Sequence, residues 1–209
     1  MTPIHDLGTG FVITIELTFL AFVLATVLGT VLTAMRIGRV GPLKWAATGY
    51  VELVRNTPVL VLLFLFVYGL PAIGLTYSLF ISTAVTVGLY EAAFICETLR
   101  AGVNTVPQGD AEAARAIGLT GLQVSRLVVI PQAARNVIQP LGNVFIATAL
   151  NTSVAAVVGL AGLTGAAQRL NIRVANPLIF AGAGAGYILI ALTGGLIAGT
   201  LDRRMRFAR

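Results

Sequence analysis

The sequence is poor in charge. Charged residues make up 11% of its 209 residues, whereas hydrophobic residues make up 57%. A soluble domain of this size normally carries about a quarter charged residues. We therefore predict an integral membrane protein with a single transmembrane domain over residues 1–209.

Several residues that support other chemistries are scarce. The one cysteine, Cys96, lies in an apolar run, so we expect a free buried thiol and no internal disulfide. The one histidine, His5, has no second ligand nearby, which argues against a metal site and against a Ser-His-Asp catalytic site. No G-x-x-x-x-G-K-[ST] phosphate loop is present, so any ATP hydrolysis must belong to another polypeptide. The first ten residues contain no lysine or arginine, and we expect no cleavable signal peptide.

Long apolar runs are plentiful. A membrane-spanning helix needs about 20 mostly apolar residues. We predict an all-α protein with five spans, over residues 11–35, about 50–70, 79–99, 137–163 and 178–201. The second span contains Pro58, and its uninterrupted apolar part is short. The Ala-Gly run 181–186 in the fifth is typical of closely packed membrane helices, although an alanine-rich composition explains it equally well.

The basic residues decide the orientation of the five spans. Basic residues gather on the cytoplasmic side of membrane proteins. Only Arg169 and Arg173 fall outside if the C-terminus is inside and the N-terminus outside. The other twelve then lie inside: Arg36, Arg39, Lys44, Arg55, Arg100, Arg115, Arg126, Arg135, Arg203, Arg204, Arg206 and Arg209. This bias explains the net charge of +6 without a nucleic-acid partner.

The cytoplasmic loop, at about residues 101–135, has the signals of two short helices. Thr105–Gln108 and Thr120–Gln123 both read as capping boxes, the first with proline in its first turn. Gly118 stands where a helix C-terminus often requires glycine, and Pro131 closes the loop. Four alanines, at 111, 113, 114 and 116, give the first helix a surface that another protein could approach closely. They would suit packing against the chain's own helices equally well.

This loop resembles the EAA loop of bacterial ABC importer permeases. Glu112-Ala113-Ala114 is followed by Gly118 and, after an apolar Val-Val-Ile stretch, by Pro131. The flanking stretches YVELVRNTP (50–58), YGLP (68–71), VNTVP (103–107) and IPQA (130–133) are similar to the polar amino acid subfamily, which takes up histidine, glutamine and glutamate. RNTP and NTVP resemble its glutamate branch. The similarity covers nearly the whole chain.

The resemblance implies a type I importer permease in the cytoplasmic (inner) membrane of a bacterium. It implies two copies of a separate ATP-binding subunit that hold ATP and magnesium, a second permease subunit identical or paralogous to this one, and an external amino acid binding protein. The chain itself would bind no cofactor and catalyse no reaction. The short helix would dock into the ATPase, and the residues expected to couple the two are Asp110, Glu112, Ala113, Ala114, Ile117, Gly118 and Pro131.

Acidic residues at membrane depth are costly and usually face a cavity or a partner. Glu97 and Arg100 have helical spacing, as do Glu52 and Arg55, and we expect both pairs to be structural. Glu91 lies about 13 Å deeper than Arg100 at a helical rise of 1.5 Å per residue. It either bonds across a subunit interface or belongs to the transport pathway. Glu16 falls near the outer surface, where solvation is favoured over substrate binding.

The fourth span carries Asn151-Thr152-Ser153, where the resembling permeases commonly have Asp-Thr-Ser. This helix is a candidate to line the pathway between two subunits, although Asn151 could equally bond only a neighbouring helix. A neutral amide supplies a donor and an acceptor but no charge for a cationic side chain. We therefore expect glutamate or glutamine as cargo, with another polar amino acid as the alternative.

Two other classes of membrane protein fit less well. A secondary transporter would normally need more spans or an inverted repeat around its site, and neither is evident. A small membrane enzyme would need nucleophile, base or metal ligands at helix ends, and the sequence offers none. A neighbouring ATPase gene and a gene for a secreted binding protein would distinguish the importer from the secondary transporter.

Overall fold

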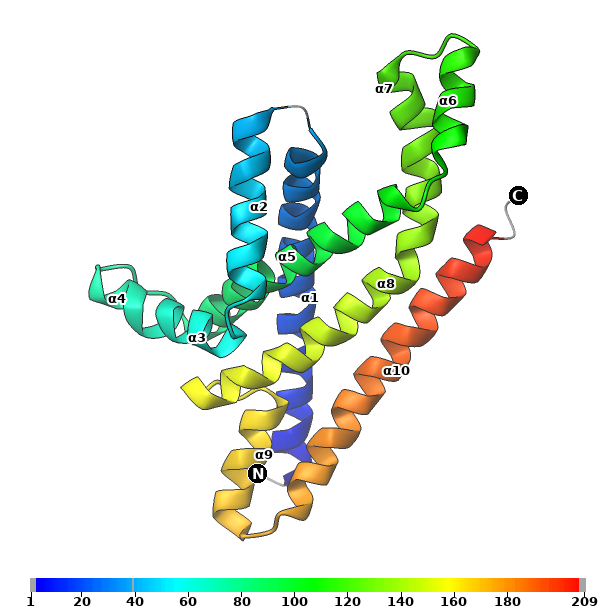
Figure 1. The fold of residues 1–209 in the computed structure, drawn as a ribbon. Helices are drawn as coiled ribbons and strands as arrows, with labels where there is room; N and C mark the ends of the chain where they lie inside the picture. Colours follow the sequence, from blue (N-terminus) through cyan, green and yellow to red (C-terminus); the bar gives the residue numbers. More distant parts are fainter. Residues whose placement is uncertain (1–2, 39, 207–209) are drawn as a thin grey trace.

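The computed structural model describes residues 3–38 and 40–206, and all regular structure in them is helical. Arg39 and Arg209, counted above among the cytoplasmic basic residues, lie outside this range. The elements follow in chain order (Figure 1): α1 (Pro3–Ile37), α2 (Gly41–Arg55), α3 (Val59–Phe64), the π-turn η1 (Leu65–Gly69), α4 (Leu70–Ala72), α5 (Leu79–Asn104), α6 (Gln108–Ala116), α7 (Gly121–Val124), the π-turn η2 (Ser125–Val129), α8 (Ile130–Asn151), the 3-10 helix η3 (Thr152–Val158), α9 (Leu163–Val174) and α10 (Leu178–Arg206).

Four helical segments are long and apolar enough to cross a membrane. They cover His5–Ile37, Leu79–Asn104, Gly121–Val158 and Leu178–Met205. The pair α2 and α3–α4 would make a fifth span, but it is bent by 102°. Pro58, which lacks an amide hydrogen and follows Arg55 by three residues, separates the two halves. The sequence anticipated an interrupted second span but not this sharp turn.

A large cluster of buried apolar side chains joins α1, α2 and α5. Its buried members are small or aliphatic. A Cβ atom on Gly29 of α1 would lie 2.7 Å from the side chain of Ile95, so α1 and α5 approach more closely than larger residues would allow. Tyr50 adds a polar tie, because its hydroxyl donates to the carbonyl oxygen of Leu89 at 2.8 Å. α5 is therefore held on two sides.

The fourth span begins and ends earlier than the sequence indicated. It starts at Gly121, inside the loop, and ends at Val158, whereas residues 137–163 were predicted. Pro131 lies in the first turn of α8, where proline is tolerated, and so it continues the helix instead of closing the loop. Gly159, with φ +91°, ends the helical run at the other end.

Helix α9 was not predicted. Arg169 and Arg173, expected only to lie outside the membrane, are both part of this helix. The hydroxyl of Thr14 in α1 accepts a hydrogen bond from the amide of Leu163 at 2.9 Å, which satisfies one of the free donors at the start of α9. Arg173 forms an ion pair of 3.4 Å with Asp6. A short helix of low hydropathy gives no membrane-span signal, which is why it was overlooked.

The Ala-Gly run of α10 is used for close packing at one position at least. A Cβ atom on Gly186 would lie 2.6 Å from Leu163, whereas one on Gly184 would meet nothing within 4 Å. The first turns of α1 lie beside α9, and α10 ends on the side of α6 and α7 (Figure 1). The two ends of the described chain thus lie at opposite ends of the bundle.

Candidate functional site

The loop between α5 and α8 folds into a helical hairpin. α6 ends in a left-handed residue, Gly118, with φ +92°. The amide of Gly118 donates to Arg115 and that of Leu119 to Ala114, at 2.9 and 3.2 Å, which is the Schellman pattern. Thr120 and Gln123 then form the predicted capping box at the start of α7. Two of the local signals read from the sequence are confirmed.

The other predicted capping box is wrong. Thr105 does not cap α6, which begins after Pro107 without a side-chain cap. Its hydroxyl donates instead to the carbonyl oxygen of Gly102 and accepts from the amide of Asn136, at 2.7 and 2.8 Å. Thr105 therefore ends α5 and ties it to α8. The prediction failed because Pro107, two residues after Thr105, takes the N-cap position of α6.

α6 has two distinct faces. Ala114 is buried, as is Val124 of α7, so one face of α6 packs within the hairpin. Ala113 and Glu112 are exposed, and Glu112 forms no hydrogen bond or ion pair with any residue that the structure describes. Packing within the chain is therefore observed at Ala114, while the exposed face of the helix remains open to the other use, docking of a partner.

The tip of the hairpin is apolar although it is exposed. Ile117 is 80% exposed and Leu122 is 68% exposed. Exposed apolar side chains that cluster next to polar ones are typical of a surface that another protein covers. Gly118 lies between them at the turn. The hairpin thus presents a carboxylate and an apolar tip on the same projection, which Figure 1 shows at the far end of α8 from α9.

The base of the hairpin is anchored to α8. Asp110 accepts a hydrogen bond of 3.0 Å from the amide of Gln132. A cavity of about 840 Å³ opens beside this contact, lined by Thr105, Pro107, Asp110, Gln132, Arg135, Asn136 and Met205. Asp110 therefore orients the hairpin, while Glu112 and Ile117 are the free groups. Pro131 is exposed, at the junction of η2 and α8.

Two polar residues predicted at membrane depth lie in contact. The amide nitrogen of Asn151, at the end of α8, donates to the carboxylate of Glu91 in α5 at 2.6 Å. Glu91 is only 2% exposed, and Asn151 is half-buried. A charged or polar group in such a place needs a partner. Of the two expectations for Asn151, the bond to a neighbouring helix is confirmed, and its place in the pathway stays a prediction.

The backbone changes character directly after this pair. α8 ends at Asn151, and Thr152 and Ser153 begin the 3-10 helix η3. Thr152 is buried, and its hydroxyl donates back to Ala149, whereas Ser153 is half-buried. Irregular backbone at membrane depth occurs where it is buried in protein or lines a cavity. Glu16 is not part of this group, since it is exposed on α1 and contacts no other polar side chain among the described residues.

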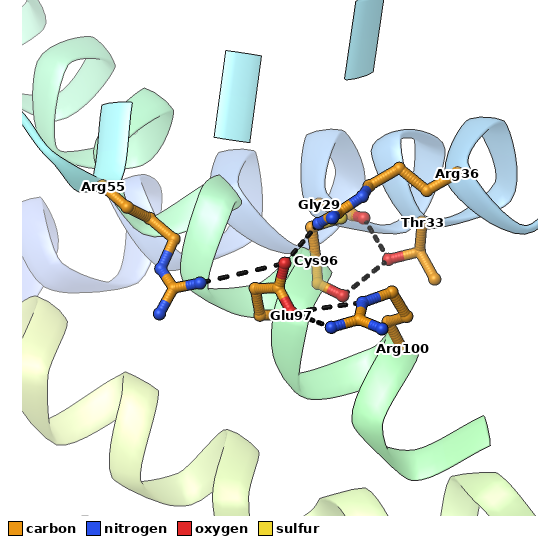
Figure 2. Close-up of polar contacts among 7 residues, drawn as sticks. All are labelled: Gly29, Thr33, Arg36, Arg55, Cys96, Glu97 and Arg100. Atoms are coloured by element: carbon orange, nitrogen blue, oxygen red, sulfur yellow. Dashed lines mark hydrogen bonds and ion pairs between the residues drawn. The ribbon is translucent and has the colours of Figure 1, made fainter. Parts of the chain in front are cut away.

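Sequence reasoning missed a second polar group around Glu97. The expected pair with Arg100 exists, at 2.7 Å. Arg55, however, does not pair with Glu52 but lies 3.8 Å from the carboxylate of Glu97. Arg36 of α1 forms a further ion pair with the same carboxylate (Figure 2). Only the α-helical spacing was visible in the sequence, and contacts between separate helices carry no such local signal.

Comparison with known proteins now identifies the family. The family model described as binding-protein-dependent transport system inner membrane component matches residues 23–207. The chain belongs to this family. As a permease component, it is part of a transport system and not itself a catalytic enzyme.

Curated relatives place this permease component more closely. The chain is 42% identical over 149 residues to the probable glutamine ABC transporter permease protein GlnM of Bacillus subtilis. This alignment covers 71% of this chain and 69% of the relative. The chain is 37% identical to the glutamate transport system permease protein GluC of Corynebacterium efficiens, over 96% of each chain. These alignments agree with the resemblance seen in the loop and its flanks.

A solved structure confirms the fold of the permease component. The crystal structure of an amino acid ABC transporter with histidines contains a chain that is 31% identical to this one. The two superpose with a TM-score of 0.91 over 95% of this chain and 94% of the other. The type I ABC permease fold is therefore shown.

Proposed function

We propose that this chain is the permease subunit of an ATP-driven importer of glutamate or glutamine in the cytoplasmic membrane of a bacterium. Family membership supports the permease role, and the relatives GlnM and GluC, whose names carry glutamine and glutamate, support the cargo. Apolar helices long enough to span a bilayer support the location. The orientation follows from the basic residues, with α6 and α7 inside and the first turn of α1 outside.

The proposal includes three partners. Two copies of an ATP-binding subunit would hold ATP and magnesium, since this sequence has no phosphate loop. A second permease subunit, identical or paralogous, would complete the pathway, and a binding protein outside would deliver the cargo. One permease subunit is too small to enclose a polar path and still present apolar surface to lipid on every side. Alternating access at the interface of the two subunits would then follow ATP binding and hydrolysis.

The single observation that carries the coupling role is the two-faced helix α6. Its inner face packs within the hairpin through Ala114, and its outer face offers Ala113 and the unpaired Glu112. Ile117 at 80% exposure provides the apolar contact that a protein partner would bury. A self-packed loop would have no reason to leave such a tip in water.

The bonded pair of Glu91 and Asn151 is the best candidate for the polar part of the pathway. Asn151 uses its amide hydrogen on Glu91, so its carbonyl oxygen remains as an acceptor. In η3, the half-buried Ser153 continues this polar group, whereas Thr152 is buried and bonds back to Ala149. Acceptors suit the ammonium group that every amino acid carries, so this pair would hold the common part of the cargo. Glu16 is the weaker candidate because it stands apart on α1.

The structure changes the argument about cargo charge. The neutral Asn151 was expected to disfavour cargo with a cationic side chain. Glu91, however, lies 2.6 Å from it, so the pair does contain an acid. The choice of glutamate or glutamine therefore rests on the named relatives, and another polar amino acid remains the alternative. An external binding protein would make most of this selection.

Co-purification and transport test the proposal together. The chain would be co-expressed with its neighbouring ATPase and binding-protein genes and purified in detergent, and ATP hydrolysis would be measured with each amino acid. Glu112→Lys should release the ATPase subunit, because it reverses the exposed negative charge on the outer face of α6. Glu52→Lys makes the same reversal on an exposed residue of α2 and should keep the ATPase bound. If wild type never retains an ATPase subunit, the coupling role is refuted.

A further inference from the structure

The carboxylate of Glu97 joins three helices. Its Oε1 contacts Nη1 of Arg36 from α1 and lies 3.8 Å from Nη1 of Arg55 from α2. Its Oε2 accepts from Nε and Nη2 of Arg100, at 3.2 and 2.7 Å. Figure 2 shows the three guanidinium groups converging on this one side chain from different directions. We call these four residues the Glu97 cluster.

The number of arginines exceeds what neutralisation requires. Arg100 lies on α5 itself and makes a forked contact, so it would suffice to balance the charge of Glu97. The other two arginines come from separate helices. The side chain of Arg36 is only 11% exposed, so it is held here and not in water. The surplus is explained if the cluster serves to connect helices.

A second contact fastens α1 to α5 at the same level. The hydroxyl of Thr33 lies 2.7 Å from the carbonyl oxygen of Gly29 in its own helix and 3.3 Å from that of Cys96 in α5 (Figure 2). Cys96 precedes Glu97 directly. Gly29 and Ile95 are also packed so closely that the two helices have no free space between them at this point. α1 and α5 are thus joined by ionic, polar and van der Waals contacts within about two turns.

Along α5, the Glu97 cluster lies between the two candidate sites, the α6 hairpin and the pair of Glu91 and Asn151. α5 ends at Asn104, and α6 begins at Gln108 after three residues. Glu97 lies about 10 Å from the end of α5 and about 9 Å from Glu91, at 1.5 Å per residue. A displacement of α6 acts on α8 through Gln132 and on α5 through the three connecting residues. Along α5, it passes Glu97 before it reaches Glu91.

We propose that Glu97 is a positioning residue that makes α1, α2 and α5 move as one body when α6 is displaced. This rests on the proposed coupling role of α6. Arg36 and Arg55 provide the connections between helices, whereas Arg100 only balances charge. Movement of the ATPase would then reach α1 and α2 through the cluster and not through α5 alone. Without these connections, ATP would be hydrolysed without a matching movement of the pathway.

Two variants of the same chemical kind separate connection from neutralisation. Arg36→Gln removes the ionic contact between α1 and α5, while Glu97 keeps Arg100 at 2.7 Å and remains neutralised. Arg100→Gln removes the contact within α5 and leaves both inter-helix contacts. Each variant would be assembled with its ATPase and binding protein in proteoliposomes. Amino acid uptake and ATP hydrolysis would be measured in the same vesicles, and their ratio compared.

We expect Arg36→Gln to lower uptake per ATP by about tenfold, a typical coupling between sites, while ATP hydrolysis stays within about twofold. Arg100→Gln should leave the ratio near that of wild type. Equal ratios in both variants, whether unchanged or reduced, would overturn the inference. If Arg36→Gln does not assemble, Arg55→Gln decides by the same ratio, because it breaks only the longer contact to α2. Loss of ATPase binding by wild type itself would instead refute the proposed function.

Discussion

The two acids of α5 differ in how the bundle neutralises them. Glu91 is 2% exposed and has one neutral partner, the amide of Asn151 at 2.6 Å. Glu97, six residues further along the same helix, has three arginines around it. Glu91 therefore has no cationic partner among the described residues, whereas Glu97 has more positive charge around it than its own charge requires.

This difference separates transport from mechanical roles. A carboxylate with one neutral hydrogen-bond partner keeps its ability to bind another donor. A carboxylate whose two oxygens already accept from Arg36 and Arg100 has less capacity for another donor, and removing it would leave the mostly buried Arg36 without its ion-pair partner. The membrane environment raises the cost of both, so neither acid would persist by chance. The contrast supports the proposals that Glu91 belongs to the pathway and that Glu97 holds the framework of helices together.

The largest effect on stability is expected from Glu97→Gln. The substitution leaves Arg36 buried without a carboxylate, and breaking a buried pair by removing one partner costs about 3–5 kcal/mol. The exposure of Arg55 and Arg100 reduces this, and we expect about 2–3 kcal/mol. Thermal unfolding of the detergent-purified complex should then shift down by about 5–10 °C. An unchanged Tm would contradict the framework role.

The double variant Glu97→Gln with Arg36→Gln provides the control. It removes the unpaired buried cation as well as the carboxylate, and its Tm should lie above that of Glu97→Gln alone. If the two losses simply add, the residues do not interact energetically.

Much of the fold was predictable, because it follows from local signals. The long apolar runs predicted α1, α5 and α10, although each helix extends beyond its run, α1 by eight residues at its start. Gly118 with the Thr120–Gln123 box predicted the turn of the hairpin. Where local signals competed, prediction failed. Pro107 starts α6 and overrides the apparent cap at Thr105, while Pro131 fits a first helical turn and continues α8. α9 has no apolar run and depends on a capping contact from Thr14, far away in the sequence.

The candidate sites divide in the same way. The surface of α6 could be anticipated, because an EAA-type helix is encoded in consecutive residues. Glu91 and Asn151 were both selected as polar residues at membrane depth, but their contact joins positions 60 residues apart. The Glu97 cluster was visible only as its helical pair with Arg100. Arg36 and Arg55 belong to it because α1 and α2 pack on α5, which no spacing reveals.

Glu91→Gln should have a smaller effect on stability and a larger one on transport. Glutamine retains an oxygen that can accept from Asn151, so the cost should stay at about 1 kcal/mol or below. Uptake in proteoliposomes should fall by about tenfold, since one full charge next to the cargo is lost. Glu91→Leu would be the harsher comparison, because it leaves the amide of Asn151 without its partner. Normal uptake by Glu91→Gln would remove Glu91 from the pathway.

Glu16 extends the comparison to an acid with neither kind of partner. It is exposed on α1, and among the described residues it contacts no arginine and no amide. Glu16→Gln should change the free energy of unfolding by less than about 0.5 kcal/mol, as for most surface substitutions. Uptake should stay within about twofold of wild type. A loss of uptake comparable to that of Glu91→Gln would mean that Glu16 faces the pathway in the assembled transporter. Burial within a single chain would then not distinguish pathway residues from others.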